Sequence, residues 1–208
     1  MTVKAPTPSP PPGVDPFDLP RLREVFDALR RGRHLCPEDG DLYWALRDHR
    51  DAYAALFGRL GFRLEAHPRD FFYFRGEGNL SDAGARMALF VFVLVEALAD
   101  QGAAVEEALL TRTFTVAELP HLGSERYRAY LREAGVEGEE GLEGVVRNLE
   151  RFGFARRLGD GRFQFRPPAY RFLDLCLQVL ADAPAAESAE GTSRVEGDAP
   201  EDGGEERP

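Results

Sequence analysis

The sequence predicts an α+β protein, mainly helical with short β-hairpins, built from two tandem winged-helix domains with disordered tails. This prediction depends on a repeat. Phe57-Gly-Arg-Leu-Gly-Phe62 is followed by a turn and Phe72-Tyr-Phe-Arg75, and later Leu149-Glu-Arg-Phe-Gly-Phe154 is followed by a turn and Phe163-Gln-Phe-Arg166. Each copy is typical of a helix that ends at glycine and continues into a hairpin, the second half of a winged helix. Two such docking modules indicate a binding or assembly protein.

The first domain is predicted over residues 21–78. Apolar residues at helical spacing run from Leu22 to Leu29, and Gly32 ends that helix. A second apolar face, from residue 42 to 60, indicates two helices or one bent helix. Strands at 62–66 and 71–75 follow. Because residues 71–74 are all aromatic, this hairpin is apolar on both faces, so one face should pack on its own domain and the other on a further surface.

The second domain is predicted over residues 79–181. It begins with a long helix at 81–101, whose middle, 87–95, is apolar all round. Such a helix should be buried on all sides, either as a hub between the domains or at a subunit interface. A short helix at 104–110, a strand at 113–115 and helices at 124–134 and 139–152 follow. The second hairpin turns at 159–161. A final helix is expected over 169–180.

The two ends of the chain differ from its middle in composition. Residues 1–20 contain seven prolines and are predicted to be a disordered leader. Residues 182–208 carry nine acidic residues and two arginines, a charge of −7 out of −10 for the chain, which predicts a disordered acidic tail. The remainder is close to balanced, so bulk charge does not indicate a DNA-binding protein. The longest apolar run is too short to span a bilayer, and we expect a cytoplasmic protein without membrane contact.

No catalytic motif is recognisable in the sequence. The nucleophile elbow, the Walker A loop, the zinc-protease motif and the Rossmann fingerprint are all missing, and the four histidines have no spacing that suggests a triad. His34 lies two residues before Cys36, but two ligands do not make a zinc site, so Cys36 and Cys176 are interpreted as core or surface thiols. We expect no enzyme activity, cofactor or metal.

DNA contact is predicted from the hairpins rather than from a recognition helix. The helix before the second hairpin presents more acids than bases on its outward face, which phosphates would repel. In the second hairpin, Arg157, Arg162 and Arg166 are expected to face outward, and Arg75 holds a comparable place in the first. These four arginines are the candidate contacts for the DNA backbone, without base reading. The alternative is that these arginines only form a solvent-exposed edge of the hairpins and do not bind DNA.

Partner contact is predicted where apolar residues exceed what a small domain can bury. The last helix is apolar around most of its circumference, with Phe172, Leu175 and Leu177 among its residues, and Phe71 and Tyr73 occupy the second face of the first hairpin. These five residues are the candidate protein contacts. The alternative for the last helix is a core element that completes the second domain.

The order and spacing of many residues along the chain resemble one family. The matching segments are Arg31 to Arg75, Arg86-Met-Ala88, Phe90 to Gly102, Glu118 to Leu122, Glu125-Arg-Tyr127, Leu131-Arg132, Leu142, Val146 to Phe154, Phe165 to Pro168 and Tyr170 to Cys176. The chain resembles MksE, the small subunit of the MukBEF-like bacterial condensin MksBEF, over nearly all of residues 22–180. No single motif carries the resemblance, and the tails have no match.

The resemblance implies a non-catalytic subunit of tandem winged helices. Such proteins form homodimers, bind the kleisin subunit (MksF-like) and lie against double-stranded DNA held, without sequence specificity, in the ring of the SMC ATPase (MksB-like). Related systems add a nuclease subunit (MksG-like) and restrict plasmids, while others organise the chromosome, so a nucleoid-associated protein is expected. Two alternatives remain at the level of sequence: a stand-alone dimeric winged-helix transcriptional regulator, and a scaffold that never touches DNA.

Overall fold

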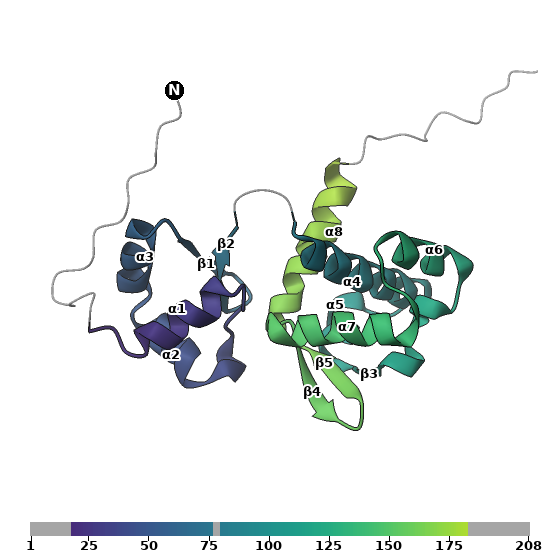
Figure 1. Ribbon diagram of the computed structural model, residues 1–208, viewed down its shortest axis with the longest axis horizontal. Coiled ribbons are helices and arrows are strands. Elements are labelled where there is room, and N and C mark those ends of the chain that lie inside the picture. The colour runs from purple at the N-terminus through teal and green to yellow at the C-terminus, as the bar shows by residue number, and fades with distance from the viewer. Residues whose placement is uncertain (1–17, 77–79, 183–208) are drawn as a thin grey trace, which may run out of the picture.

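The computed structural model describes residues 18–76 and 80–182, the last four of these by their backbone alone. The described chain forms two mainly helical halves, each with its own antiparallel hairpin (Figure 1). The α+β class is therefore confirmed. Among the described helices none is by itself long and apolar enough to cross a membrane; α4 (Asp82–Asp100) and α5 (Val105–Thr111) reach that composition only together, across a bend of 120°.

The first half contains three helices and a hairpin. Its elements, in chain order, are α1 (Leu22–Arg30), the 3-10 turn η1 (Pro37–Asp39), α2 (Asp41–Asp48), α3 (Arg50–Arg59), β1 (Arg63–His67) and β2 (Phe71–Arg75). The apolar face predicted over 42–60 is thus two helices, broken at His49. The strands pair antiparallel with Glu65 opposite Tyr73. An isolated bridge between Leu35 and Phe72 ties the loop after α1 to this hairpin.

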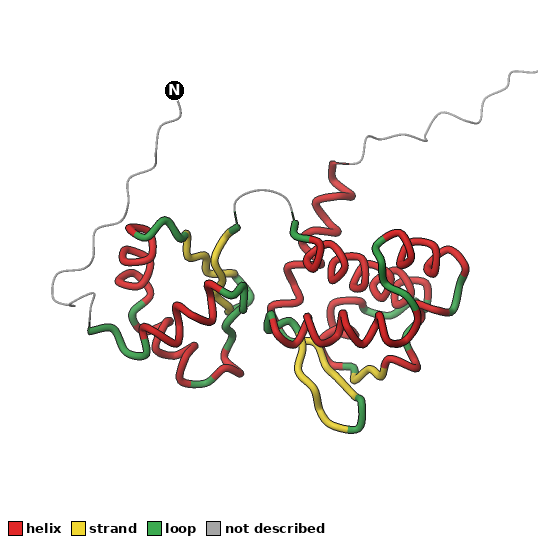
Figure 2. Tube along the Cα trace, in the orientation of Figure 1, coloured by secondary structure: helices red, strands yellow, loops and turns green. Residues whose placement is uncertain are grey.

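The second half contains five helices and a three-stranded sheet in its described residues. Its elements are α4 (Asp82–Asp100), α5 (Val105–Thr111), β3 (Thr113–Thr115), η2 (Val116–Glu118), η3 (Pro120–Leu122), α6 (Glu125–Glu133), α7 (Gly138–Arg151), β4 (Ala155–Gly159), β5 (Arg162–Phe165), η4 (Pro167–Ala169) and α8 (Tyr170–Asp182). The antiparallel sheet has the order β3-β5-β4. Figure 2 shows the β4–β5 hairpin extending beyond the helices that surround it.

Each half has a separate hydrophobic cluster. The first is centred on the buried side chains of Val25, Tyr53 and Phe57, and the second on Phe90, Leu142 and Phe163. Both clusters follow from the helical spacing of apolar residues, since α1 and α7 each bury one stripe. The two clusters place the break between the halves close to the undescribed residues 77–79.

The sequence repeat corresponds to the same backbone arrangement in both halves. Gly61 and Gly153 follow α3 and α7 with φ of 84° and 83°, the left-handed conformation that ends a helix at low cost for glycine.

The hydroxyl groups of Ser81 and Ser124 accept the N–H of Gly84 and Tyr127 and so cap α4 and α6.

Three expectations need adjustment. The helix α4 is not buried on all sides, because Phe92 is 43% exposed, although seven of its other apolar residues are buried. Leu19, which we assigned to the leader, is buried in the first cluster, and the carbonyl of Pro20 accepts a hydrogen bond from Tyr53. The first strand begins at Arg63 rather than at Phe62. The predicted disorder of residues 1–17 and 183–208 lies outside the described residues.

Candidate interaction surfaces and the junction between the halves

The second face of the first hairpin packs against the second half of the same chain. Phe72 and Phe74 point into the first cluster, as the alternation of a strand requires. Phe71 and Tyr73 lie on the opposite face; Phe71 is 1% exposed and stacks on His67, with ring centres 4.2 Å apart. His67 in turn contacts Asp174 of α8 at 2.8 Å. The aromatic side chains on the second face of this hairpin are therefore covered by other residues of the same chain.

The turn between β1 and β2 also reaches the second half. The guanidinium of Arg69 lies 4.2 Å from the centre of the Tyr170 ring and donates a hydrogen bond to Glu106 at 3.1 Å. Arg69 and Glu106 are both exposed, so their ion pair contributes little by itself. Their role is to fix the hairpin turn beside α5 and the start of α8.

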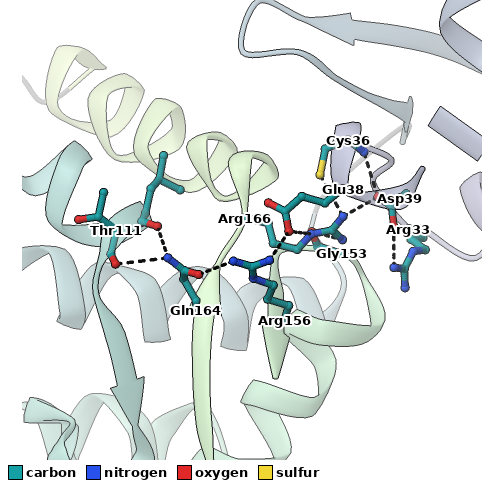
Figure 3. Close-up of polar contacts among 10 residues, drawn as sticks. Arg33, Cys36, Glu38, Asp39, Thr111, Gly153, Arg156, Gln164 and Arg166 are labelled. Atoms are coloured by element: carbon teal, nitrogen blue, oxygen red, sulfur yellow. Dashed lines mark hydrogen bonds and ion pairs between the residues drawn. The ribbon is translucent and has the colours of Figure 1, made fainter. Parts of the chain in front are cut away.

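A buried ionic cluster joins η1 to the end of β5 (Figure 3). Arg166, 4% exposed, donates from Nη2 to Asp39 at 2.7 Å, and its Nε lies 3.4 Å from the carboxylate of Glu38. Asp39 accepts two further bonds, from Arg33 at 2.8 Å and from the backbone N–H of Cys36 at 3.0 Å. The Asp39 carboxylate thus has the hydrogen bonds that a buried charge requires.

The charges in this cluster stabilise one another. Burial alone would raise the pKa of Asp39, but the hydrogen bonds from Arg166 and Arg33 hold it below its usual value. Burial would likewise lower the pKa of Arg166, and the bond to Asp39 raises it instead. Burial raises the pKa of Cys36, which lies 3.0 Å from Arg166, to about 11, so this thiol stays protonated and unreactive.

A second chain of contacts continues from this cluster along the sheet (Figure 3). Arg156 of β4 lies 3.4 Å from Glu38 and donates to the side-chain oxygen of Gln164 at 2.7 Å. The amide nitrogen of Gln164 donates to the carbonyl of Leu110 at 2.9 Å. The second hairpin is therefore connected to η1 on one side and to the end of α5 on the other.

His34 is the other buried connection between the halves. Its backbone N–H and its Nδ1 both lie within hydrogen-bond distance of the Phe152 carbonyl, at 2.9 and 3.2 Å. Nδ1 therefore carries the proton, and Nε2 accepts a bond from Arg171 at 2.9 Å. Burial, together with the charge of Arg171, lowers the pKa of His34 to about 3, so the ring is neutral under ordinary conditions. It also packs on Phe154, with centres 4.3 Å apart.

The two halves lie in close contact at Gly153. A methyl group on its Cα would lie 2.5 Å from the carbonyl oxygen of His34, which no side chain tolerates without displacement of the backbone. Gly61, the equivalent residue of the first repeat, has open space at the same position. The conformation is shared by both glycines, but only Gly153 is required for the junction.

The four candidate DNA contacts lie in different surroundings. The side chains of Arg75 and Arg162 are 62% and 52% exposed, with weak ion pairs of 3.7 Å to Glu65 and Asp160. Arg157 is 33% exposed and engaged by Glu143 at 2.7 Å and Glu150 at 3.5 Å. The outward orientation expected for Arg166 is wrong, because this residue is buried in the ionic cluster between the halves. The structure does not bring the four arginines into one site.

The five candidate protein contacts also divide. Phe71 and Phe172 are buried, at 1% and 7% exposure, so the expectation that they offer free apolar surface is wrong. Tyr73 is partly covered, stacked on His34 and under the guanidinium of Arg171. Leu175 is half-buried on α8. Leu177 is the exposed residue among the five, at 64% exposure.

The residues that hold the junction were not identified from the sequence. Asp39 lies in a Pro-Glu-Asp-Gly segment that indicates only a turn, and His34 and Arg171 have no motif around them. The repeat itself was the available signal: Arg166 is followed by two prolines, which end the strand and direct the chain into α8, whereas Arg75 is followed by glycine. In the described residues no group of three or more metal-ligating side chains comes together.

Comparison with known protein families assigns most of the chain to one family. A family model described as "Condensin complex protein MksE" matches residues 20–177, which is most of the chain and covers both halves. The chain belongs to the MksE family. Among curated proteins no match was found. Membership of the MksE family makes this chain a subunit of a condensin complex, and the match begins and ends close to the limits of the packed structure, at Leu19 and α8.

Proposed function

We propose that this MksE-family chain is a non-catalytic accessory subunit of a bacterial SMC complex. It forms a homodimer, binds the kleisin subunit and, through the kleisin, the SMC ATPase, and helps to hold double-stranded DNA without sequence preference. The family match over residues 20–177 carries this proposal. Each half is interpreted as a winged helix, supported by a hairpin that follows α1, α2 and α3 in the first half and α4 to α7 in the second. Such a subunit acts on the chromosome or, with a nuclease subunit, on plasmids, in the cytoplasm beside the nucleoid.

The kleisin is assigned to α8 and its surroundings. Leu177 is an exposed leucine on a helix whose other face closes the second core through Phe172 and Leu173. Because the helix is already held in place by the core, a partner can bury an exposed apolar side chain on it with little loss of backbone conformational entropy. The buried residue Phe172 supports this surface from behind rather than by direct contact.

The homodimer is assigned to the open side of α4. Phe92, 43% exposed, lies one helical turn before Glu96, whose carboxylate pairs with Arg126 of α6. Tyr130, 40% exposed, lies one turn after Arg126. Two exposed aromatic rings therefore flank one ion pair on neighbouring helices, a composition typical of the centre of a protein interface.

Co-expression with the kleisin of the same complex tests this proposal. We expect a stable complex, which size-exclusion chromatography with light scattering should show to contain two copies of this chain.

Leu177→Asp should weaken kleisin binding by about tenfold or more, because a charge would be buried at the contact. Leu60→Asp, at a similarly exposed leucine directly after α3 (57%), is the matched control. If only the control variant lost the kleisin, the α8 assignment would be wrong. A chain that bound one particular duplex and no kleisin would favour a regulator.

DNA contact is tested most directly at Arg162, at the tip of the second hairpin. Arg162→Ala should lower the affinity for random duplex and reduce the slope of log affinity against log salt by about 0.9, the value for one lost phosphate contact. Arg128→Ala on α6, an arginine of similar exposure (48%), should change neither quantity. Equal effects of the two substitutions would mean that only overall charge matters and that the hairpin is a solvated edge.

A further inference from the structure

A cleft lies between the two halves, and the proposed function assigns no role to the charged and apolar side chains that line it. It encloses about 460 Å³, with β2 on one side, α8 on the other, and the beginning of α4 and the end of α7 between them. Tyr73 and Arg75 face Arg171 and Asp174 across it, and Met87 and Leu175 contribute apolar surface. A cleft of this size holds one or two side chains of a peptide.

The central charge of the cleft is Arg171, and it has no carboxylate partner within ion-pair distance among the residues that the structure describes. Its guanidinium donates to the neutral ring of His34 at 2.9 Å and lies 4.2 Å above the Tyr73 ring. Burial lowers its pKa. Asp174, one turn further along α8, is held by His67 on the other side. A partly buried cation that lacks an anion is costly, and a carboxylate would remove that cost.

The surroundings favour a carboxylate on a peptide over a phosphate of DNA. The planar fork of arginine matches a carboxylate in a bidentate arrangement, and Arg75, 62% exposed at the cleft, offers a second cation. Asp174 and the apolar side chains Met87, Phe154 and Leu175 would oppose a highly charged backbone but suit small apolar residues beside one or two acids.

Such a segment follows α8 directly. Residues 183–208 contain eight acids and two arginines, and they begin Ala-Pro-Ala-Ala-Glu187-Ser-Ala-Glu190. From Arg171 to the end of α8 the helix rises about 16 Å. The eight residues from Asp182 to Glu190 span up to about 27 Å when extended, which is enough to turn back and reach Arg171. Attachment to the same chain gives these acids an effective concentration of the order of millimolar.

We propose that the cleft binds the chain's own acidic tail, with Glu187 and Glu190 as the carboxylates that pair with Arg171 and Arg75. The docked tail screens Arg75, one of the candidate DNA contacts. It also occupies the position that an acidic segment of another subunit would need.

Hydrogen exchange measured by mass spectrometry on the full chain tests this contact without DNA or kleisin, so the outcome is independent of the proposed function. We expect amides around Glu187–Glu190 to exchange about fivefold more slowly than those near Glu205, as for a segment docked about four-fifths of the time. The double substitution Glu187→Gln/Glu190→Gln should remove this difference. Its matched control, Glu205→Gln/Glu206→Gln, removes the same charge farther along and should leave it unchanged.

A second measurement concerns the consequence for DNA. At 50 mM salt the inner pair of substitutions should raise the affinity for random duplex about two- to fivefold more than the outer pair does. The proposal is overturned if residues 183–208 exchange uniformly as free chain, or if both pairs change exchange equally. It is also overturned if the tail stays free while the amides of α8 become protected only when another subunit is added, since the occupant is then an acidic segment of that subunit.

Discussion

Gly153→Ala should destabilise the protein by about 3–5 kcal/mol. A residue other than glycine at φ 83° costs about 1 kcal/mol, and the new methyl group would lie 2.5 Å from the His34 carbonyl oxygen, so that the backbone at the junction must move at a cost of about 2–4 kcal/mol. Urea unfolding followed by circular dichroism measures this loss, and the melting temperature should fall by about 6–20 °C.

Gly61→Ala is the matched control for this substitution. Gly61 ends the equivalent helix of the first repeat with φ 84°, but a methyl group there meets no atom within 4 Å. It should therefore lose only the conformational contribution of about 1 kcal/mol. The difference between the two variants isolates the contact between the halves. Equal losses would show that the halves are not packed at Gly153 in solution as they are in the structure.

Arg166→Ala should cost about 3 kcal/mol. The substitution leaves the Asp39 carboxylate buried, with the guanidinium of Arg33 as its remaining cation within hydrogen-bond distance among the described residues, and removal of one partner of a buried pair typically costs 3–5 kcal/mol. Arg75→Ala, at the equivalent position of the repeat, removes a 62% exposed side chain and should change stability by less than about 0.5 kcal/mol. Both values come from the same denaturation experiment.

A double-mutant cycle with Asp39→Ala separates the pair from its surroundings. Because Asp39 and Arg166 share one hydrogen bond, the double variant should lose clearly less than the sum of the two single losses, with a coupling of about 1–3 kcal/mol. Additive losses would mean that Arg166 stabilises the junction through its packing alone. Arg166→Ala is also expected to leave the salt dependence of DNA binding unchanged, since this side chain is not on the surface.

The sequence by itself determined the secondary structure and its repetition. Helix ends at Gly61 and Gly153, the caps at Ser81 and Ser124, and the hairpin turns were predictable because capping and turn formation depend on residues within one turn of each other. The resemblance to MksE was also visible in the sequence alone, since it depends on the order of residues along the whole chain.

Only the tertiary structure decided which equivalent residues are buried. Arg75 and Arg166 hold the same place in the repeat, yet the first is exposed and the second lies in an ionic cluster with Asp39, which is far away in the sequence. Likewise, the aromatic residues Phe71 and Tyr73 indicated a partner, but Phe71 is buried beside His34 and His67, and Tyr73 lies under Arg171 of α8 in the same chain. A local sequence pattern indicates that a side chain will be buried against another surface. It does not indicate which surface, because that depends on contacts between residues more than a hundred positions apart, and the spacing of residues within one helix or strand does not encode such contacts.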